Sequence, residues 1–126
     1  MNKAPQMRII TMLNENTCPS VLIDARRGRI RFHRELLSSL DDPQYILLMI
    51  DPAQRSLIVT PCEDGTPCAH KLQWSSNSVC EIYSRSFIRR FSLLTGLQAG
   101  QSYRFIGKSL SDKHAVIFDL RGTVHI

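Results

Sequence analysis

The stretch DARRGRIRFHREL, Asp24–Leu36, decides the interpretation of the fold because apolar and basic side chains alternate in it. Ile30 and Phe32 each stand between two basic residues. A period of two predicts a strand with one apolar and one basic face, since successive side chains of a strand point to opposite sides. A second strand, residues 21–24, is predicted before it, across a turn in which Gly28 is free to take positive φ. We expect the apolar face to cover the core and the guanidinium groups to face a polyanion.

Helical spacing replaces the alternation directly after this strand. From Arg34 onward, leucines recur on one helical face, and the run Asp41–Pro43 ends the helix. Two apolar runs then flank a PAQR turn, at residues 45–51 and 56–61. Such a pair predicts a β-hairpin.

The second half of the chain repeats the order strand, helix, hairpin. The expected elements are a strand at 79–84, a helix at 85–97 with Gly96 as its C-cap, strands at 102–107 and 115–120, and a short last strand within 121–126. Tyr45 and Tyr103 begin the third element of each half, which indicates a degenerate internal repeat. Two unrelated βαββ pieces are the alternative.

A polar connector rich in Gly, Pro and Ser, residues 62–78, separates the two halves. We interpret residues 1–126 as a single compact unit, with a first half at 18–61 and a second half at 79–126. The N-terminal run Met7–Leu13 is expected to form a further strand or a helical arm.

Composition places the chain among soluble globular proteins of moderate basicity. Sixteen Lys and Arg against eleven Asp and Glu give a net charge of +5, and 43% of the 126 residues are hydrophobic. This charge suits a polyanionic partner. The sequence has no apolar run long enough for a membrane span and no recognisable signal peptide, so we expect a cytoplasmic protein with no membrane partner and with reduced cysteines.

The segment GRIRFHRELLSSLDDPQYILLMIDPAQRSLIVTP, residues 28–61, resembles the AbrB family of swapped-hairpin DNA-binding domains, whose relatives include MazE-type antitoxins and MraZ proteins. Two such halves in one chain resemble the MraZ architecture most. The positions that match the family motifs are Gly28, Arg29, Ile30, Phe32, Glu35 and Leu36 in the first half, and Ile88, Arg89, Arg90, Gly96, Leu97 and Gly100 in the second.

The chain departs from the family pattern at four places. His33 stands where the family has a proline, and Leu40–Asp41 replaces a Leu-Gly turn. The second half lacks the Gly-Arg pair at its start. The Asp-x-x-x-Arg motif of MraZ proteins is also stretched by one residue, from Asp24 to Arg29. The resemblance therefore supports the fold better than the function.

The resemblance implies an α+β fold in which two βαββ halves form an intramolecular swapped-hairpin pseudo-dimer, with YILLMI and AVIFDL in the common core. It also implies that the basic strand and the second helix contact duplex DNA, where arginine matches guanine edges and phosphates. The candidate contacts are Arg26, Arg27, Arg29, Arg31, Arg34, Arg85, Arg89 and Arg90. The alternatives are a solvated basic edge that discourages aggregation and an ordinary helix surface.

Metal binding and catalysis have weak support in the sequence. Cys62, Cys68, His70 and Cys80 lack the close ligand pairs of a structural zinc site, so we expect no metal and no cofactor. No nucleophile, phosphate-binding loop or metal-spaced His-Glu pair is present, and we expect no enzyme activity. Trp74 is either a packing anchor for the connector or an aromatic of an interface.

The sequence therefore predicts a DNA-binding transcriptional regulator or antitoxin-like repressor. Its expected partner is duplex DNA, and a second copy of the chain or another protein is a further candidate partner. Two alternatives stay open. One is a protein-interaction module on the same fold without DNA binding. The other is a ligand-binding protein with a pocket between the halves.

Overall fold

The computed structural model describes residues 19–98, 100–110, 112–121 and 124–125, so the predicted N-terminal element at 7–13 lies outside the described residues. Most secondary-structure predictions are confirmed within a residue or two. The strands are β1 (Ser20–Asp24), β2 (Arg29–His33), β3 (Tyr45–Asp51), β4 (Ser56–Cys62), β5 (His70–Lys71), β6 (Gln73–Trp74), β7 (Val79–Tyr83), β8 (Ser102–Leu110), β9 (Ala115–Asp119) and β10 (Val124–His125). The helices are α2 (Arg34–Ser39) and α3 (Arg85–Thr95).

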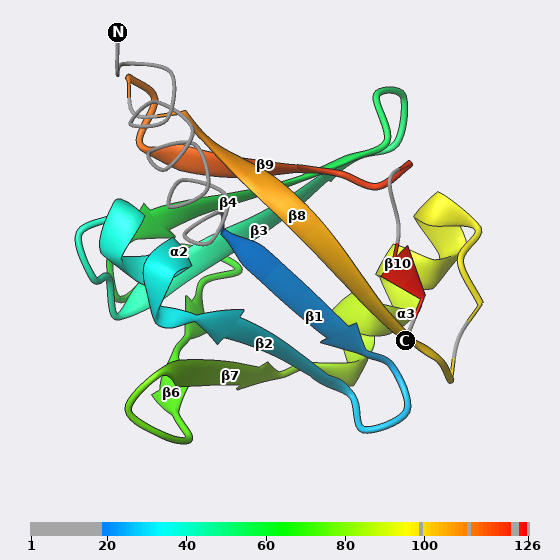
Figure 1. Cartoon of the computed structure of the whole chain (residues 1–126), viewed down its shortest axis with the longest axis horizontal. Helices are drawn as coiled ribbons and strands as arrows, with labels where there is room; N and C mark the ends of the chain where they lie inside the picture. The colour runs from blue at the N-terminus through cyan, green and yellow to red at the C-terminus, as the bar shows by residue number, and fades with distance from the viewer. Residues whose placement is uncertain (1–18, 99, 111, 122–123, 126) are drawn as a thin grey trace, which may run out of the picture.

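The predicted α+β assembly of two swapped-hairpin βαββ halves is wrong. The strands join into one antiparallel sheet in the order β5-β3-β4-β9-β8-β1-β2-β7-β6, with β10 pairing β8. This sheet curls into a nearly closed barrel in which strand accounts for 47% and helix for 17% of the structure. Figure 1 shows the long diagonal strand β8 crossing the barrel beside β1.

The barrel closes through the segment that the sequence suggested was only a polar connector. Its strands β5 and β6 pair with β3 and β7, at the two ends of the sheet. Leu72 is the one residue between them; its side chain is buried and its N–H donates to the Gln44 carbonyl at 3.0 Å. One residue thus joins the two edges of the sheet.

The order strand, helix, hairpin occurs twice, as β2-α2-β3-β4 and as β7-α3-β8-β9. Equivalent strands of the two halves are neighbours, because β2 pairs antiparallel with β7 and β4 pairs antiparallel with β9. β1 has no counterpart in this scheme and lies between β2 and β8. The two halves therefore share one sheet and one core.

The core draws apolar side chains from both halves rather than mainly from the two strands predicted for it. In β3 only Ile46 is fully buried, and Met49 is 43% exposed. The largest fully buried side chains are Phe32, Phe91, Phe105, Phe118, Ile23, Ile30, Leu36, Leu37, Leu40, Ile46, Leu57 and Leu120.

The helix α3 lays its apolar face on this core. Phe91 packs edge-on against Phe105 of β8 with ring centroids 6.0 Å apart. The helix begins after Ser84, whose hydroxyl accepts the N–H of Phe87 at 3.2 Å. It ends at Gly96, which has φ 75°, so the predicted C-cap is confirmed. Over the described ranges, neither helix is long and apolar enough to cross a membrane.

Candidate nucleic-acid interface

The basic strand β2 has the two faces that its alternation predicts. Ile30 and Phe32 are fully buried in the core. Arg29, Arg31 and His33 point to the other side of the sheet and are partly or fully exposed. The predicted alternation is therefore confirmed: the apolar side chains of β2 face the core, and its basic side chains lie on the outer face of the barrel.

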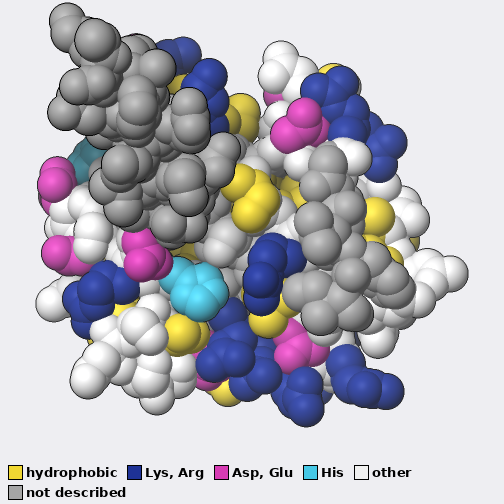
Figure 2. Space-filling view, in the orientation of Figure 1, with side chains coloured by type: hydrophobic (Ala, Val, Ile, Leu, Met, Phe, Trp, Pro, Cys, Tyr) yellow, Lys and Arg dark blue, Asp and Glu magenta, His cyan; other side chains and the backbone are white. Residues whose placement is uncertain are grey.

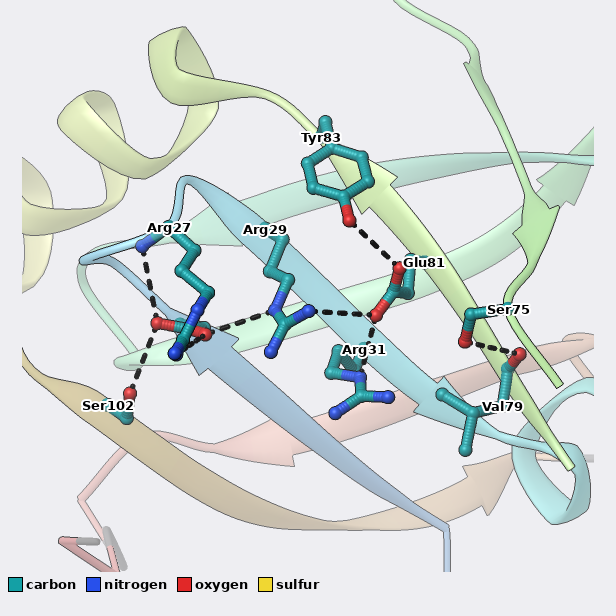
Figure 3. Close-up of polar contacts among 9 residues, drawn as sticks. Arg27, Arg29, Arg31, Ser75, Val79, Glu81, Tyr83 and Ser102 are labelled. Carbon is teal, nitrogen blue, oxygen red and sulfur yellow. Dashed lines mark hydrogen bonds and ion pairs between the residues drawn. The ribbon is translucent and has the colours of Figure 1, made fainter.

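Carboxylates of the same molecule bind the outward arginines of β2 (Figure 3). Arg29 Nε donates to Asp24 Oδ2 at 3.0 Å, and Arg29 Nη1 donates to Glu81 Oε2 at 3.3 Å. Arg31 Nε lies 2.8 Å from the same Glu81 oxygen, as an ion pair whose N–H is not aligned for a hydrogen bond. Asp24, Arg29, Glu81 and Arg31 form a continuous ion-pair network across three strands.

Strand register explains this network. Asp24 of β1 stands opposite Arg29 of β2, and Arg31 of β2 stands opposite Glu81 of β7. The two carboxylates are almost completely buried, with side-chain exposures of 3% and 8%. Buried carboxylates need cationic or hydrogen-bonding partners. Arg29 and Arg31 are consequently structural residues, and their guanidinium groups are already engaged.

Hydroxyl groups complete the hydrogen bonding of both carboxylates. The Tyr83 hydroxyl donates to Glu81 Oε1 at 3.0 Å, and the Ser102 hydroxyl donates to Asp24 Oδ1 at 3.3 Å. Burial raises the pKa of Asp24, but hydrogen bonds from Arg27 and Arg29 outweigh it and hold that pKa below the usual range of an aspartate. Asp24 is therefore ionised at neutral pH.

Arg27 and Arg34 also have partners within the chain. The backbone N–H of Arg27 donates to Asp24 Oδ1 at 3.3 Å, and its exposed side chain pairs with Asp24 Oδ2 at 3.2 Å. Arg34 lies at the other end of β2, over the ring of Trp74. Half of the eight predicted DNA contacts thus have at least one intramolecular partner.

The other four predicted arginines lie on α3 and on the β1–β2 turn. Among the described residues, no carboxylate lies within ion-pair distance of Arg26, Arg85, Arg89 or Arg90, and all four are exposed. The sequence of α3 contains no acidic residue. These four arginines are defined here as the basic surface.

Gly28 brings the turn and the helix of this surface together. It has φ +69°, and a Cβ built on it would lie 2.6 Å from Arg85 Cγ, so the Arg85 side chain crosses directly over the turn. The Gly28 carbonyl also accepts the N–H of Ser84 at 3.0 Å, next to the start of α3. Arg85 and Arg89 line a hollow of about 170 Å³ beside Gly28.

Figure 2 shows dark blue side chains gathered along the lower edge of the molecule, where Figure 1 places the β1–β2 turn. The spacing i, i+4 of Arg85 and Arg89 keeps both on one side of α3, as the sequence predicted. Like charges so placed repel one another unless an anion lies between them.

Glu81 is the site residue that sequence reasoning missed. Its signal is a single carboxylate within the apolar strand VCEIY, where a charged side chain needs a cross-strand partner. That partner is far away in the sequence, so no local pattern identifies it.

The thiol and imidazole groups of the connector and β7 do not form a metal site. Among the described residues, no group of three or more His, Cys, Asp or Glu side chains is placed to hold a metal ion. Burial lowers the pKa of His70, whose ring packs edge-on against Phe87 at 6.0 Å. Burial also raises the pKa of Cys80 to about 11.

Cys80 is accordingly expected to resist alkylation in the folded protein. The thiolate is the reactive form, and both burial and a pKa of about 11 keep its population low at neutral pH. Iodoacetamide labelling followed by peptide mass spectrometry is expected to modify the exposed Cys68 and to leave Cys80 unmodified until denaturant is added. Equal labelling of the two in native buffer would contradict the described burial.

No protein-family model matches the chain, and neither a curated protein nor a solved structure matches it. The resemblance to the AbrB family therefore rests on the short motifs of the sequence alone. The function has to be argued from the surface chemistry of this chain.

Proposed function

We propose that the protein binds duplex DNA through the basic surface of α3 and the β1–β2 turn, in the role of a transcriptional regulator. The observation that carries the proposal is the placement of four exposed arginines without a described carboxylate partner on two adjoining segments. Arginine binds phosphate in a bidentate manner, and phosphate contacts supply most of the affinity of basic proteins for DNA. The net charge of +5 supports the same partner.

Arg29 and Arg31 are not part of the proposed contact surface. Moving their guanidinium groups to a phosphate would leave Asp24 and Glu81 buried without their main cationic partners. In this proposal β2 stabilises the barrel that presents the turn and α3, and it does not itself read DNA.

The decisive variant is Arg85→Gln/Arg89→Gln. We expect it to weaken duplex DNA binding roughly tenfold or more, because two charge-assisted phosphate contacts are lost. The slope of log K against log salt is expected to fall by roughly 1 for each arginine removed. Fluorescence anisotropy with a labelled duplex, titrated at several salt concentrations, measures both quantities.

Lys113→Gln is the matched control for this experiment. It removes a positive charge from the exposed turn between β8 and β9, at the end of the barrel away from α3 in Figure 1. It is expected to leave affinity and salt slope almost unchanged. If the double variant binds as tightly as this control, the basic surface is not the DNA-binding site.

A protein-interaction module is the second candidate function, favoured by apolar side chains on the surface beside α3. Leu93 is 80% exposed, and Leu94 and Met49 are each 43% exposed. Exposed apolar side chains that lie together usually mark a surface on which another protein docks. The absence of salt-dependent DNA binding in the titration above would favour this second function.

A further inference from the structure

The chain has a single tryptophan, and this residue lines an open pocket. Trp74 is 48% exposed on β6, at the lower left of Figure 1. The pocket beside it has a volume of about 600 Å³, within the range of small-molecule sites. Since exposed indole rings are enriched where proteins bind partners, the pocket is a candidate ligand site.

Arg34 is held in place over Trp74. Its guanidinium carbon lies 4.5 Å from the centroid of the ring. Nε donates to the carbonyl of Asn77 at 2.8 Å, and Nη2 donates to the same oxygen. The backbone N–H of Arg34 donates to the Ser78 carbonyl at 2.9 Å. The remaining guanidinium N–H groups make no further contact with a described residue, so they are available to an anion.

The rest of the pocket has a positive balance and polar groups that suit a nucleobase. Lys71 of β5 adds a second cation, and Asp42 is the one acidic residue of the lining. The side chains of Gln44 and Asn77 offer amide donors and acceptors. Arg34 covers one face of the Trp74 ring, so a ligand can stack only on the part of the ring that stays exposed. A ligand that uses this exposed part and the cations must be aromatic and anionic.

We propose that this pocket binds a nucleotide, with the base stacked on Trp74 and the phosphate bound by Arg34 and Lys71. Base stacking on an aromatic side chain combined with cationic phosphate contacts is the chemistry by which proteins hold single nucleotides and unpaired strands. The nucleotide is either free or a unit of a single-stranded nucleic acid.

This site is separate from the proposed DNA surface. The β1–β2 turn precedes β2 and Arg34 follows it, so the two lie at opposite ends of that strand. No residue of the basic surface lines the pocket. The nucleotide proposal therefore stands or fails independently of the duplex-binding proposal.

Tryptophan fluorescence of the full chain tests the proposal directly, because Trp74 is its only indole. The ligands to titrate are adenosine monophosphate, adenosine, inorganic phosphate and a short single-stranded deoxyadenosine oligonucleotide. We expect saturable quenching by adenosine monophosphate and much weaker responses to adenosine or phosphate, since each of these supplies only half of the contacts. A free indole compound corrects for absorption by the base.

The variant Lys71→Gln is expected to raise the apparent Kd for adenosine monophosphate roughly tenfold, because one charged phosphate contact is lost. Lys71 is exposed on a short edge strand, so this variant is expected to fold. Arg34→Lys keeps the charge and removes the planar stack, and is expected to weaken binding and to change the unliganded emission of Trp74. Lys113→Gln again serves as the charge-matched control.

The titrations separate the two sources of the nucleotide. Tighter quenching by the oligonucleotide identifies a single-strand site, and equal or tighter quenching by the mononucleotide identifies a site for a free nucleotide. Quenching that rises linearly without saturation, or a Lys71→Gln variant that titrates like the Lys113→Gln control, would overturn the proposal.

Discussion

Replacing Arg29 with alanine is expected to lower the free energy of unfolding by about 3 kcal/mol, the lower end of the cost of breaking a buried ion pair. Arg29 bridges Asp24 and Glu81, whose side chains are almost completely buried. Each carboxylate keeps one further arginine partner, Arg27 or Arg31, which is why the loss is not larger. Urea unfolding followed by circular dichroism measures the change.

Two further variants isolate the charge from the packing. Arg29→Met keeps an aliphatic stem over the sheet and is expected to lose nearly as much stability as Arg29→Ala. Arg26→Ala removes an exposed arginine two residues before Gly28 and is expected to change stability by less than about 0.5 kcal/mol. Similar losses for Arg26→Ala and Arg29→Ala would show that the network contributes nothing specific.

The effect of Arg29→Ala is also expected to depend on pH. The folded-state pKa of Asp24 lies below the ordinary pKa of an aspartate, about 3.9, so its ionised form stabilises the fold above that pH. This contribution is lost as the pH falls through the lowered folded pKa. The stability difference between the wild type and Arg29→Ala should therefore be complete at neutral pH and narrow below about pH 4.

The second large effect is expected at Gly107, which lies opposite Phe118 in the β8–β9 pair. A Cβ at this position would lie 2.6 Å from Phe118 Cε1 and 2.8 Å from Val116 Cγ1, both in fully buried side chains. Gly107→Ala is expected to lower the free energy of unfolding by about 1–3 kcal/mol through overpacking. Thermal and urea unfolding give the value.

A double variant tests whether steric overlap is the cause. Phe118→Leu alone leaves a cavity and destabilises the barrel, but combined with Gly107→Ala it makes room for the added methyl group. The double variant is expected to be more stable than the sum of the two single changes implies, and strictly additive losses would contradict the described packing.

Local features of the fold were predictable from the sequence because they depend on neighbouring residues. The alternation around Ile30 and Phe32 gives the buried face of β2, and Gly96 gives the end of α3. The assembly was not predictable in the same way. Periodicity shows which face of a strand is buried and contains no information about which strand lies beside it.

For the candidate site, too, the local features were predictable and the long-range contacts were not. The sequence shows the surplus of arginine, and four of the eight arginines proposed as contacts have no carboxylate partner among the described residues. It does not show that Glu81 stands opposite Arg31, because their pairing follows from the neighbouring positions of β2 and β7. Whether an arginine is available to a ligand is decided by such long-range contacts.

The position of β1 has a consequence for protein synthesis. Asp24 at the end of this strand meets Ser102 of β8, which is translated 78 residues later. While the ribosome is still making the middle of the chain, one edge of β1 has no strand to pair with, and such an edge invites association between nascent chains. The barrel can therefore close only after β8 has been translated, and until then this edge of β1 stays open to pairing with another chain.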